Sequence, residues 1–216
     1  MSTRTQYEAD LAALKGSLAK MSQLSADAVE DALEALCTAD AEEAKGIIKG
    51  DTEVNRMERD IEHRCMTLLL RQQPVASDLR QISAALKMIT DMERIGDQAE
   101  DIAEIITFLG GRGAENSNLL REMARSTIKM VTESVDAYVR QDVDLAQQVI
   151  AADDEVDGYF DRIKAHLIDR IAKDVDDGEA TLDLLMIAKY YERIGDHATN
   201  IAEWVIFSIT GRHKEG

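Results

Sequence analysis

One segment of the chain occurs twice. It reads ERIGDQAEDIAE from Glu93 and ERIGDHATNIAE from Glu192, an offset of 99 residues. In a second pair of segments, ADAEEAKGIIKGDTEVN ends at Asn55 and QDVDLAQQVIAADDEVD ends at Asp157, an offset of 102 residues. The difference between the two offsets falls in a hairpin loop, where length is least constrained. The sequence therefore predicts two similar units related by an internal pseudo-repeat.

Composition indicates what kind of unit is repeated. The 216 residues include a single proline, and aromatic residues make up only 4%. Few aromatics, almost no proline and many Ala, Leu, Ile, Glu and Asp residues favour an all-α protein. Apolar periodicity and helix breakers predict six helices. Their approximate ranges are 7–38, 41–73, 78–109, 119–140, 143–173 and 181–210.

The only glycine-rich break in the chain is GGRGAENSN, from Gly110 to Asn118. We place the domain boundary there, which gives one unit over residues 1–112 and a second over residues 113–216. Each unit holds three predicted helices, and short loops make consecutive helices antiparallel neighbours. The predicted architecture is two three-helix bundles in tandem.

The charge balance limits the partners. The net charge is −17, which argues against nucleic acid, because phosphate binding needs clustered Lys and Arg. The same charge would be repelled by an anionic membrane surface, whereas it suits cations or basic patches on partner proteins. The most apolar stretch, AEWVIFSI, is far shorter than the ~20 residues of a membrane span, so no membrane insertion is expected. Without an N-terminal apolar region or a disulfide framework, we expect a cytoplasmic protein.

Acidic residues form a stripe on each helix of the first predicted hairpin. On a helical projection, one stripe comprises Glu93, Asp97, Glu100, Asp101 and Glu104, and the other comprises Asp51, Asn55, Glu58 and Glu62. If the turn is centred near Ala76, Asp51 lies level with Asp101, Asn55 with Asp97, and Glu58 near Glu93. The second hairpin repeats the pattern. There Asp153 lies level with Asn200, Asp157 with Asp196, and Asp161 with Glu192.

Crowded carboxylates resist ionisation unless a counter-charge is present. Oxygen-only ligands select hard ions such as Mg²⁺, Mn²⁺, Ca²⁺ or iron, so each stripe is a candidate metal site. The neighbouring arginines 59, 94, 162 and 193 could neutralise the stripes instead, or the stripes could be ordinary solvated faces. Gly96 and Gly195 lie mid-helix and either permit close helix approach under the acids or simply pack tightly. The four histidines, including His197, are interpreted as surface or packing residues.

The doubled ERIGD-x-A-x-[DN]-I, the QPVASDLR hairpin and the DTEVN and DDEVD segments resemble the PhoU family over essentially the whole chain. The resemblance implies two tandem three-helix bundles and an acidic motif, (E/D)-x-x-x-D, that binds iron or zinc clusters, Mg²⁺ or Mn²⁺ in some members. The motif matches Asp51–Asn55, Glu93–Asp97, Asp153–Asp157 and Glu192–Asp196, with Asn55 in place of an acid. Together with the level positions, the candidate metal ligands are Asp51, Asn55, Glu93, Asp97, Asp101, Asp153, Asp157, Glu192, Asp196 and Asn200.

The resemblance also implies a function. Members of the family signal phosphate sufficiency from the high-affinity phosphate ABC transporter to a membrane histidine kinase, repress the phosphate-starvation response and restrain phosphate uptake. The expected partners are the ATPase subunit of the transporter, the sensor kinase and a second copy of the chain as a homodimer. The expected protein is thus a non-enzymatic adaptor. A carboxylate-bridged metalloenzyme and a metal-free helical interaction module are the alternatives, and the absence of any Glu-x-x-His spacing disfavours the former.

Overall fold

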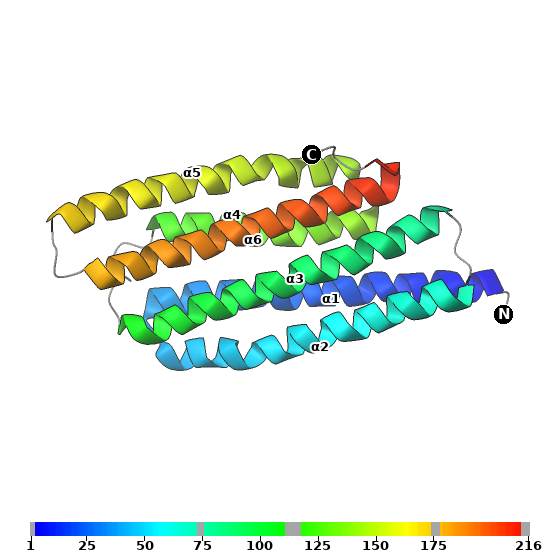
Figure 1. Cartoon of the computed structure of the whole chain (residues 1–216), viewed down its shortest axis with the longest axis horizontal. Helices are drawn as coiled ribbons and strands as arrows, with labels where there is room; N and C mark the ends of the chain where they lie inside the picture. The colour runs from blue at the N-terminus through cyan, green and yellow to red at the C-terminus, as the bar shows by residue number, and fades with distance from the viewer. Residues whose placement is uncertain (1–2, 73–75, 111–117, 174–177, 213–216) are drawn as a thin grey trace.

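The computed structural model describes residues 3–72, 76–110, 118–173 and 178–212 (Figure 1). Across these ranges it contains six long helices and no strand, so the prediction of an all-α chain is confirmed. The helices are α1 (Thr3–Thr38), α2 (Ala41–Gln72), α3 (Ala76–Leu109), α4 (Asn118–Arg140), α5 (Val143–Lys173) and α6 (Gly178–Thr210). The first and last helices start a few residues earlier than their apolar periodicity predicts.

The helices pack as two three-helix bundles, as predicted. Helices α1, α2 and α3 contact one another in the first bundle, and α4, α5 and α6 do so in the second. The bundles lie side by side in one elongated molecule, with α3 running antiparallel to α6 along the seam between them (Figure 1). Helix α1 also contacts α4. The predicted boundary between residues 112 and 113 lies outside the described residues and stays a prediction.

The tight turns between the first two helices of each bundle show how closely the repeat is kept. Ala39 and Gln141 both have a φ of 56°, in the left-handed region, and they are 102 residues apart. The next residue in each copy caps the following helix. Asp40 Oδ1 accepts the backbone N–H of Glu42 at 2.9 Å, and Asp142 Oδ1 accepts that of Leu145 at 3.0 Å. The offset of 102 residues seen in the sequence therefore also relates the α1–α2 turn to the α4–α5 turn in the structure.

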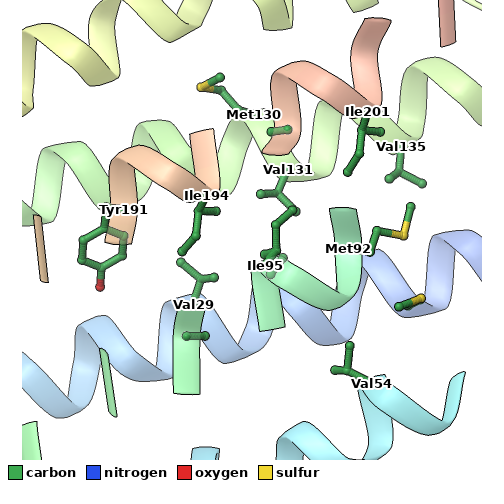
Figure 2. Packing of buried hydrophobic residues seen from close by; sticks show 14 of the residues in the cluster. Val29, Val54, Met92, Ile95, Met130, Val131, Val135, Tyr191, Ile194 and Ile201 are labelled. Atoms are coloured by element: carbon green, nitrogen blue, oxygen red, sulfur yellow. The ribbon is translucent and has the colours of Figure 1, made fainter. Parts of the chain in front are cut away.

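The core is continuous across the seam. Buried side chains of α3 and α6 pack against each other and against their own bundles, as Figure 2 shows for Met92 and Ile95 beside Ile194 and Ile201. On α3, Ile82, Ile89 and Met92 are buried and Leu86 is half-buried. Polar contacts also cross between the bundles; for example, the hydroxyl of Tyr138 donates to the carbonyl of Gln81 at 3.0 Å. This packing fixes α3 and α6 at the centre of the molecule.

Candidate metal centres

The first acidic cluster lies where α3 approaches α2 most closely. Gly96 is buried, and a Cβ added to it would lie 3.1 Å from Asp51 Oδ1 and 3.2 Å from Val54 Cγ1. The absence of a side chain at this position therefore lets the α2 backbone come near, and it brings the Asp51 carboxylate against α3. Gly96 thus lies against both the Asp51 carboxylate and the Val54 side chain. The two interpretations of this glycine, close helix approach under the acids and tight packing, describe the same contact.

Three carboxylates converge in this cluster. Ligand oxygens of Asp51, Asp97 and Glu100 all lie within 4.8 Å of one another. The predicted pairing of Asp51 with Asp101 is wrong by about one turn. Helix α2 ends at Gln72 and α3 begins at Ala76, so the hairpin is centred about two residues earlier than assumed, and Asp51 lies beside Gly96 and Asp97.

Electrostatics in the first cluster favour a cation. Asp51 Oδ1 is buried and has no hydrogen-bond partner among the residues that the structure describes, and its other oxygen accepts a hydrogen bond from the Asn55 amide. Burial, and then the charge of Asp97, raise the pKa of Asp51, while the Asn55 hydrogen bond acts in the opposite direction. Burial is also the largest cause of the raised pKa of Glu93, Asp97 and Glu100. A bound divalent ion would relieve each of these costs.

The second cluster repeats the glycine contact on α5 and α6. A Cβ at Gly195 would lie 3.3 Å from Asp153 Oδ1 and 3.4 Å from Val156 Cγ1, in the same relation as in the first bundle. Burial, and then the neighbouring charges of Asp157, Asp196 and Glu192, raise the pKa of Asp153 to about 6. These four carboxylates therefore form one electrostatically coupled group.

The second cluster also contains its own cation. The Lys189 ammonium forms an ion pair with the Glu192 carboxylate and lies 5.5 Å from the centre of the Phe160 ring. The arginines next to the acids act differently. The Nε atoms of Arg59 and Arg162 each donate to a backbone carbonyl one turn earlier, at 3.1 Å. In the second cluster, Lys189 thus neutralises part of the acidic charge through its ion pair with Glu192.

Two of the predicted ligands lie at the seam between the bundles. Asn200 donates to Asp91 Oδ1 at 3.3 Å, and His197 Nδ1 lies 2.9 Å from the same oxygen. Asp101 also lies near α6. Burial raises the pKa of its carboxyl, and the charge of Arg193 on α6 lowers it. A ligand role for Asp101 and Asn200 stays a prediction.

Sequence reasoning missed three residues that matter here. Glu100 belonged to the predicted stripe but was not selected as a ligand, although it lies one turn after Gly96. Asp91 and His197 are both buried at the seam. Their pairing joins residues 106 positions apart on different bundles, and neither position repeats, since the counterparts are Tyr190 and Gln98. The pairing therefore left no repeat signal in the sequence.

The donor set of the first cluster fits a hard divalent ion, and the same role for the second cluster stays a prediction. Each cluster offers carboxylate oxygens on two adjacent helices, with one aspartate held against a glycine of the opposite helix. Oxygen ligands of this kind select Mg²⁺, Mn²⁺, Ca²⁺ or iron over soft metals. In the first cluster the buried, unpartnered oxygen of Asp51 is the most direct indication, since such an atom is costly without a partner.

Fold and site together define a class: an all-α protein of two tandem three-helix bundles, each with an acidic cluster between its second and third helices. Comparison with known proteins identifies the family. A model of the PhoU domain matches residues 18–106 and again residues 120–205, so the chain belongs to the PhoU family.

Relatives and solved structures agree with this assignment. The phosphate-specific transport system accessory protein PhoU homolog of Clostridium acetobutylicum is 37% identical over 99% of this chain and 98% of its own length. The PhoU protein of Escherichia coli is 32% identical over 98% of this chain and 89% of its own length. The crystal structure of PhoU from Pseudomonas aeruginosa superimposes with a TM-score of 0.88 at 36% identity, covering 95% of this chain and all of that one.

Similarity extends to a more distant structure. The phosphate transport system regulatory protein PhoU from Streptococcus pneumoniae superimposes with a TM-score of 0.89 at 26% identity, covering 97% of this chain and all of that one. Among the described residues, no helix has the length and apolar character needed to cross a membrane.

Proposed function

We propose that this protein is a metal-binding adaptor of phosphate homeostasis. It would act in the cytoplasm with the phosphate-specific transport system, link the transporter's ATPase subunit to a phosphate-sensing histidine kinase, and keep the phosphate-starvation response repressed when phosphate is plentiful. Membership in the PhoU family supports this proposal, as do relatives described as accessory proteins of phosphate-specific transport. A homodimer is part of the proposal, and nucleic acid is not.

The metal sites are the part of the proposal that this chain's own residues support. Asp51, Asp97 and Glu100 would hold an ion in the first bundle, with Glu93 and the Asn55 amide beside them. In the second bundle the ligands would be Asp153, Asp157, Glu192 and Asp196. Two observations carry this assignment: the carboxylates of Asp51, Asp97 and Glu100 converge, and the Asp51 oxygen beside Gly96 is buried without a partner among the described residues.

A bound ion would act structurally in such an adaptor. It would cross-link α2 to α3, or α5 to α6, and neutralise acids that otherwise repel one another. An ion that binds only the folded chain also stabilises it, by about 2.7 kcal/mol per site when the free ion is at 100 times Kd. The clusters would thereby set both the rigidity and the surface charge that a partner meets.

A reporter assay in living cells tests the regulatory role. Deleting the gene should make a phosphate-regulated promoter active in high phosphate, and the wild-type gene should restore repression. Asp97→Lys places a positive charge in the first cluster on a half-buried helix position, so it should keep the helical circular-dichroism spectrum while failing to restore repression. Unchanged repression in the deletion strain would contradict the adaptor role, and full repression by Asp97→Lys would show that the first cluster is dispensable for signalling.

A further inference from the structure

A groove with an apolar floor runs along the first bundle between α1 and α2. Its volume is about 490 Å³, within the range of sites that bind a ligand or a side-chain cluster. The floor is formed by Leu24 and Ala28 of α1 and by Ile47 and Val54 of α2. One end of the groove reaches Asp51 and Gly96, so it adjoins the first acidic cluster.

Two glycines keep this groove open. Gly46 and Gly50 lie one turn apart within α2, and a Cβ added to either would meet no atom within 4 Å. Each glycine costs about 1 kcal/mol relative to alanine in a helix interior. Gly96, by contrast, has a packing reason, because α2 fills the space above it. No such contact explains Gly46 and Gly50, so the chain holds empty space at a cost in helix stability.

The second bundle shows that the fold does not need this groove. With the offset of 102, the counterparts of Gly46 and Gly50 are Gln148 and Ala152. On the facing helix, Ala28 corresponds to Met130 and Asp27 to Lys129. The second copy thus carries larger side chains in the space and a cation on the rim, although its helices and caps follow the same register.

The rim of the groove is acidic. Asp27 and Asp31 border it on α1, and Glu43 and Glu53 border it on α2. Glu53 lies 3.8 Å from Lys20 and 3.7 Å from Arg56, but among the residues that the structure describes no Lys or Arg forms an ion pair with Asp31 or Glu43. Burial and the neighbouring acids raise the pKa of both of these carboxyls. A cation brought to the rim would therefore be attracted on both sides of the floor.

We propose that this groove docks a short basic amphipathic helix of a partner protein. Apolar side chains of that helix would lie on the floor, and flanking Lys or Arg side chains would reach the rim carboxylates, which is the helix-in-groove mode of recognition. The lining positions 24–31 on α1 and 43–54 on α2 span about 10 to 17 Å, which suits two to three turns. The biological role of this partner rests on the proposed adaptor function.

Binding of a synthetic helix to the full chain tests this inference. The probe is a blocked, fluorescein-labelled peptide of about four turns, with Leu and Ala on one face and Lys and Arg flanking them. Fluorescence anisotropy is recorded at 0.15 M salt, because the net charge of −17 would attract any basic peptide at low salt. The key variant is Gly46→Gln with Gly50→Ala, which installs the residues of the second bundle and leaves the net charge unchanged.

The filled variant should bind the probe at least about tenfold more weakly, or 1.4 kcal/mol. The matched control is Gly16→Ala, which also adds a methyl group to open space on a long helix but outside the groove, and it should bind like the wild type. A peptide with Glu in place of Lys and Arg should not bind. Equal affinity of the filled variant and the wild type would overturn the proposal.

Two further outcomes would also overturn it. If the basic and acidic peptides bind equally, the rim has no role in recognition. If filling the groove changes the oligomeric state in sedimentation and leaves peptide binding intact, the groove is an interface between copies of this chain. Groove-dependent peptide binding combined with unchanged promoter repression in the gene deletion would uphold the docking site and contradict the adaptor function instead.

Discussion

The two bundles share their framework and differ in their charges. Both keep a glycine against an aspartate and a valine of the neighbouring helix, and both keep the same left-handed turn and aspartate cap. Beside the acids, however, Thr90 of the first bundle corresponds to Lys189 of the second, Asn55 to Asp157, and Glu100 to Thr199. The bundles share the packing positions and the acids of the repeated ERIGD segment, whereas these three neighbouring positions have diverged.

This divergence gives the two clusters different resting states. In the first, three carboxylates converge and one buried oxygen has no partner. In the second, Lys189 already pairs with Glu192, and Asp153 has a pKa of about 6. A metal ion entering the second cluster must displace an internal cation. We therefore expect the first cluster to bind a divalent ion more tightly than the second.

The largest expected effect concerns the seam where the bundles meet. His197→Leu would leave the buried Asp91 carboxylate with the Asn200 amide alone. Unpairing a buried charge costs about 3 kcal/mol or more, so the melting temperature should fall by roughly 6 to 12 °C. His197→Gln, which installs the residue found at the equivalent position 98, keeps a donor and should lose much less. Equal losses in the two variants, measured by thermal denaturation, would show that the hydrogen bond to Asp91 is unimportant.

The next effect compares the two glycines beneath the acids. In Gly96→Ala the new methyl group meets Asp51 and Val54 at 3.1 and 3.2 Å. The overpacking cost of about 1 to 3 kcal/mol should exceed the helix-propensity gain of about 1 kcal/mol. Gly195→Ala has looser contacts of 3.3 and 3.4 Å and should be close to neutral. Urea denaturation of both variants measures the difference, and a more stable Gly96→Ala would mean that α2 and α3 can separate without cost.

A smaller effect is the pH dependence of the second cluster. The folded-state pKa of Asp153 is about 6, above its ordinary value near 4. Its ionisation therefore destabilises the fold above pH 6, and this cost disappears as the pH falls below about 4. In EDTA, Asp153→Asn should be more stable than the wild type at pH 7.5 by up to about 1 kcal/mol, after allowance for its partial exposure.

The pH dependence of the stability difference between Asp153→Asn and the wild type tests the direction of this pKa shift. The stability advantage of Asp153→Asn should shrink as the pH is lowered from 7.5 to 4.5, since the wild-type carboxyl then becomes protonated. Chemical denaturation at several pH values follows this gap. An advantage that grows at low pH would mean that the Asp153 carboxylate is stabilised in the folded chain, against the direction of its pKa.

We expect the smallest effect when the residues that distinguish the two clusters are exchanged. Lys189→Thr removes the internal cation of the second cluster and should tighten Mn²⁺ binding there. Thr90→Lys adds the equivalent cation to the first cluster and should weaken binding there. A partly exposed ion pair contributes about 0.2 to 1 kcal/mol, so each Kd should change by a factor of about 1.4 to 5. Calorimetric titration measures both, and unchanged affinities would remove Lys189 as the cause of any inequality.

The sequence predicted the helices, the pseudo-repeat and the acidic stripes, because these follow from local periodicity. It misplaced Asp51 by about one turn relative to α3, since the apolar periodicity of two helices does not determine the exact centre of the turn between them. It could not place Asp91 beside His197, because that contact depends on how two bundles pack along α3 and α6. Asp101 and Asn200 were grouped with the stripes for the same reason, although both face this seam.

We propose that each bundle holds its own divalent-ion site and that the site in the first bundle binds the ion more tightly. Calorimetric titration of Mn²⁺ into metal-stripped protein at pH 7 tests it most directly, comparing the wild type with Asp51→Asn plus Asp97→Asn and with Asp153→Asn plus Asp196→Asn. We expect two binding events in the wild type, loss of the tighter one in the first variant, and loss of only the weaker one in the second. Absence of Mn²⁺ binding, or loss of both events in either variant, would contradict it.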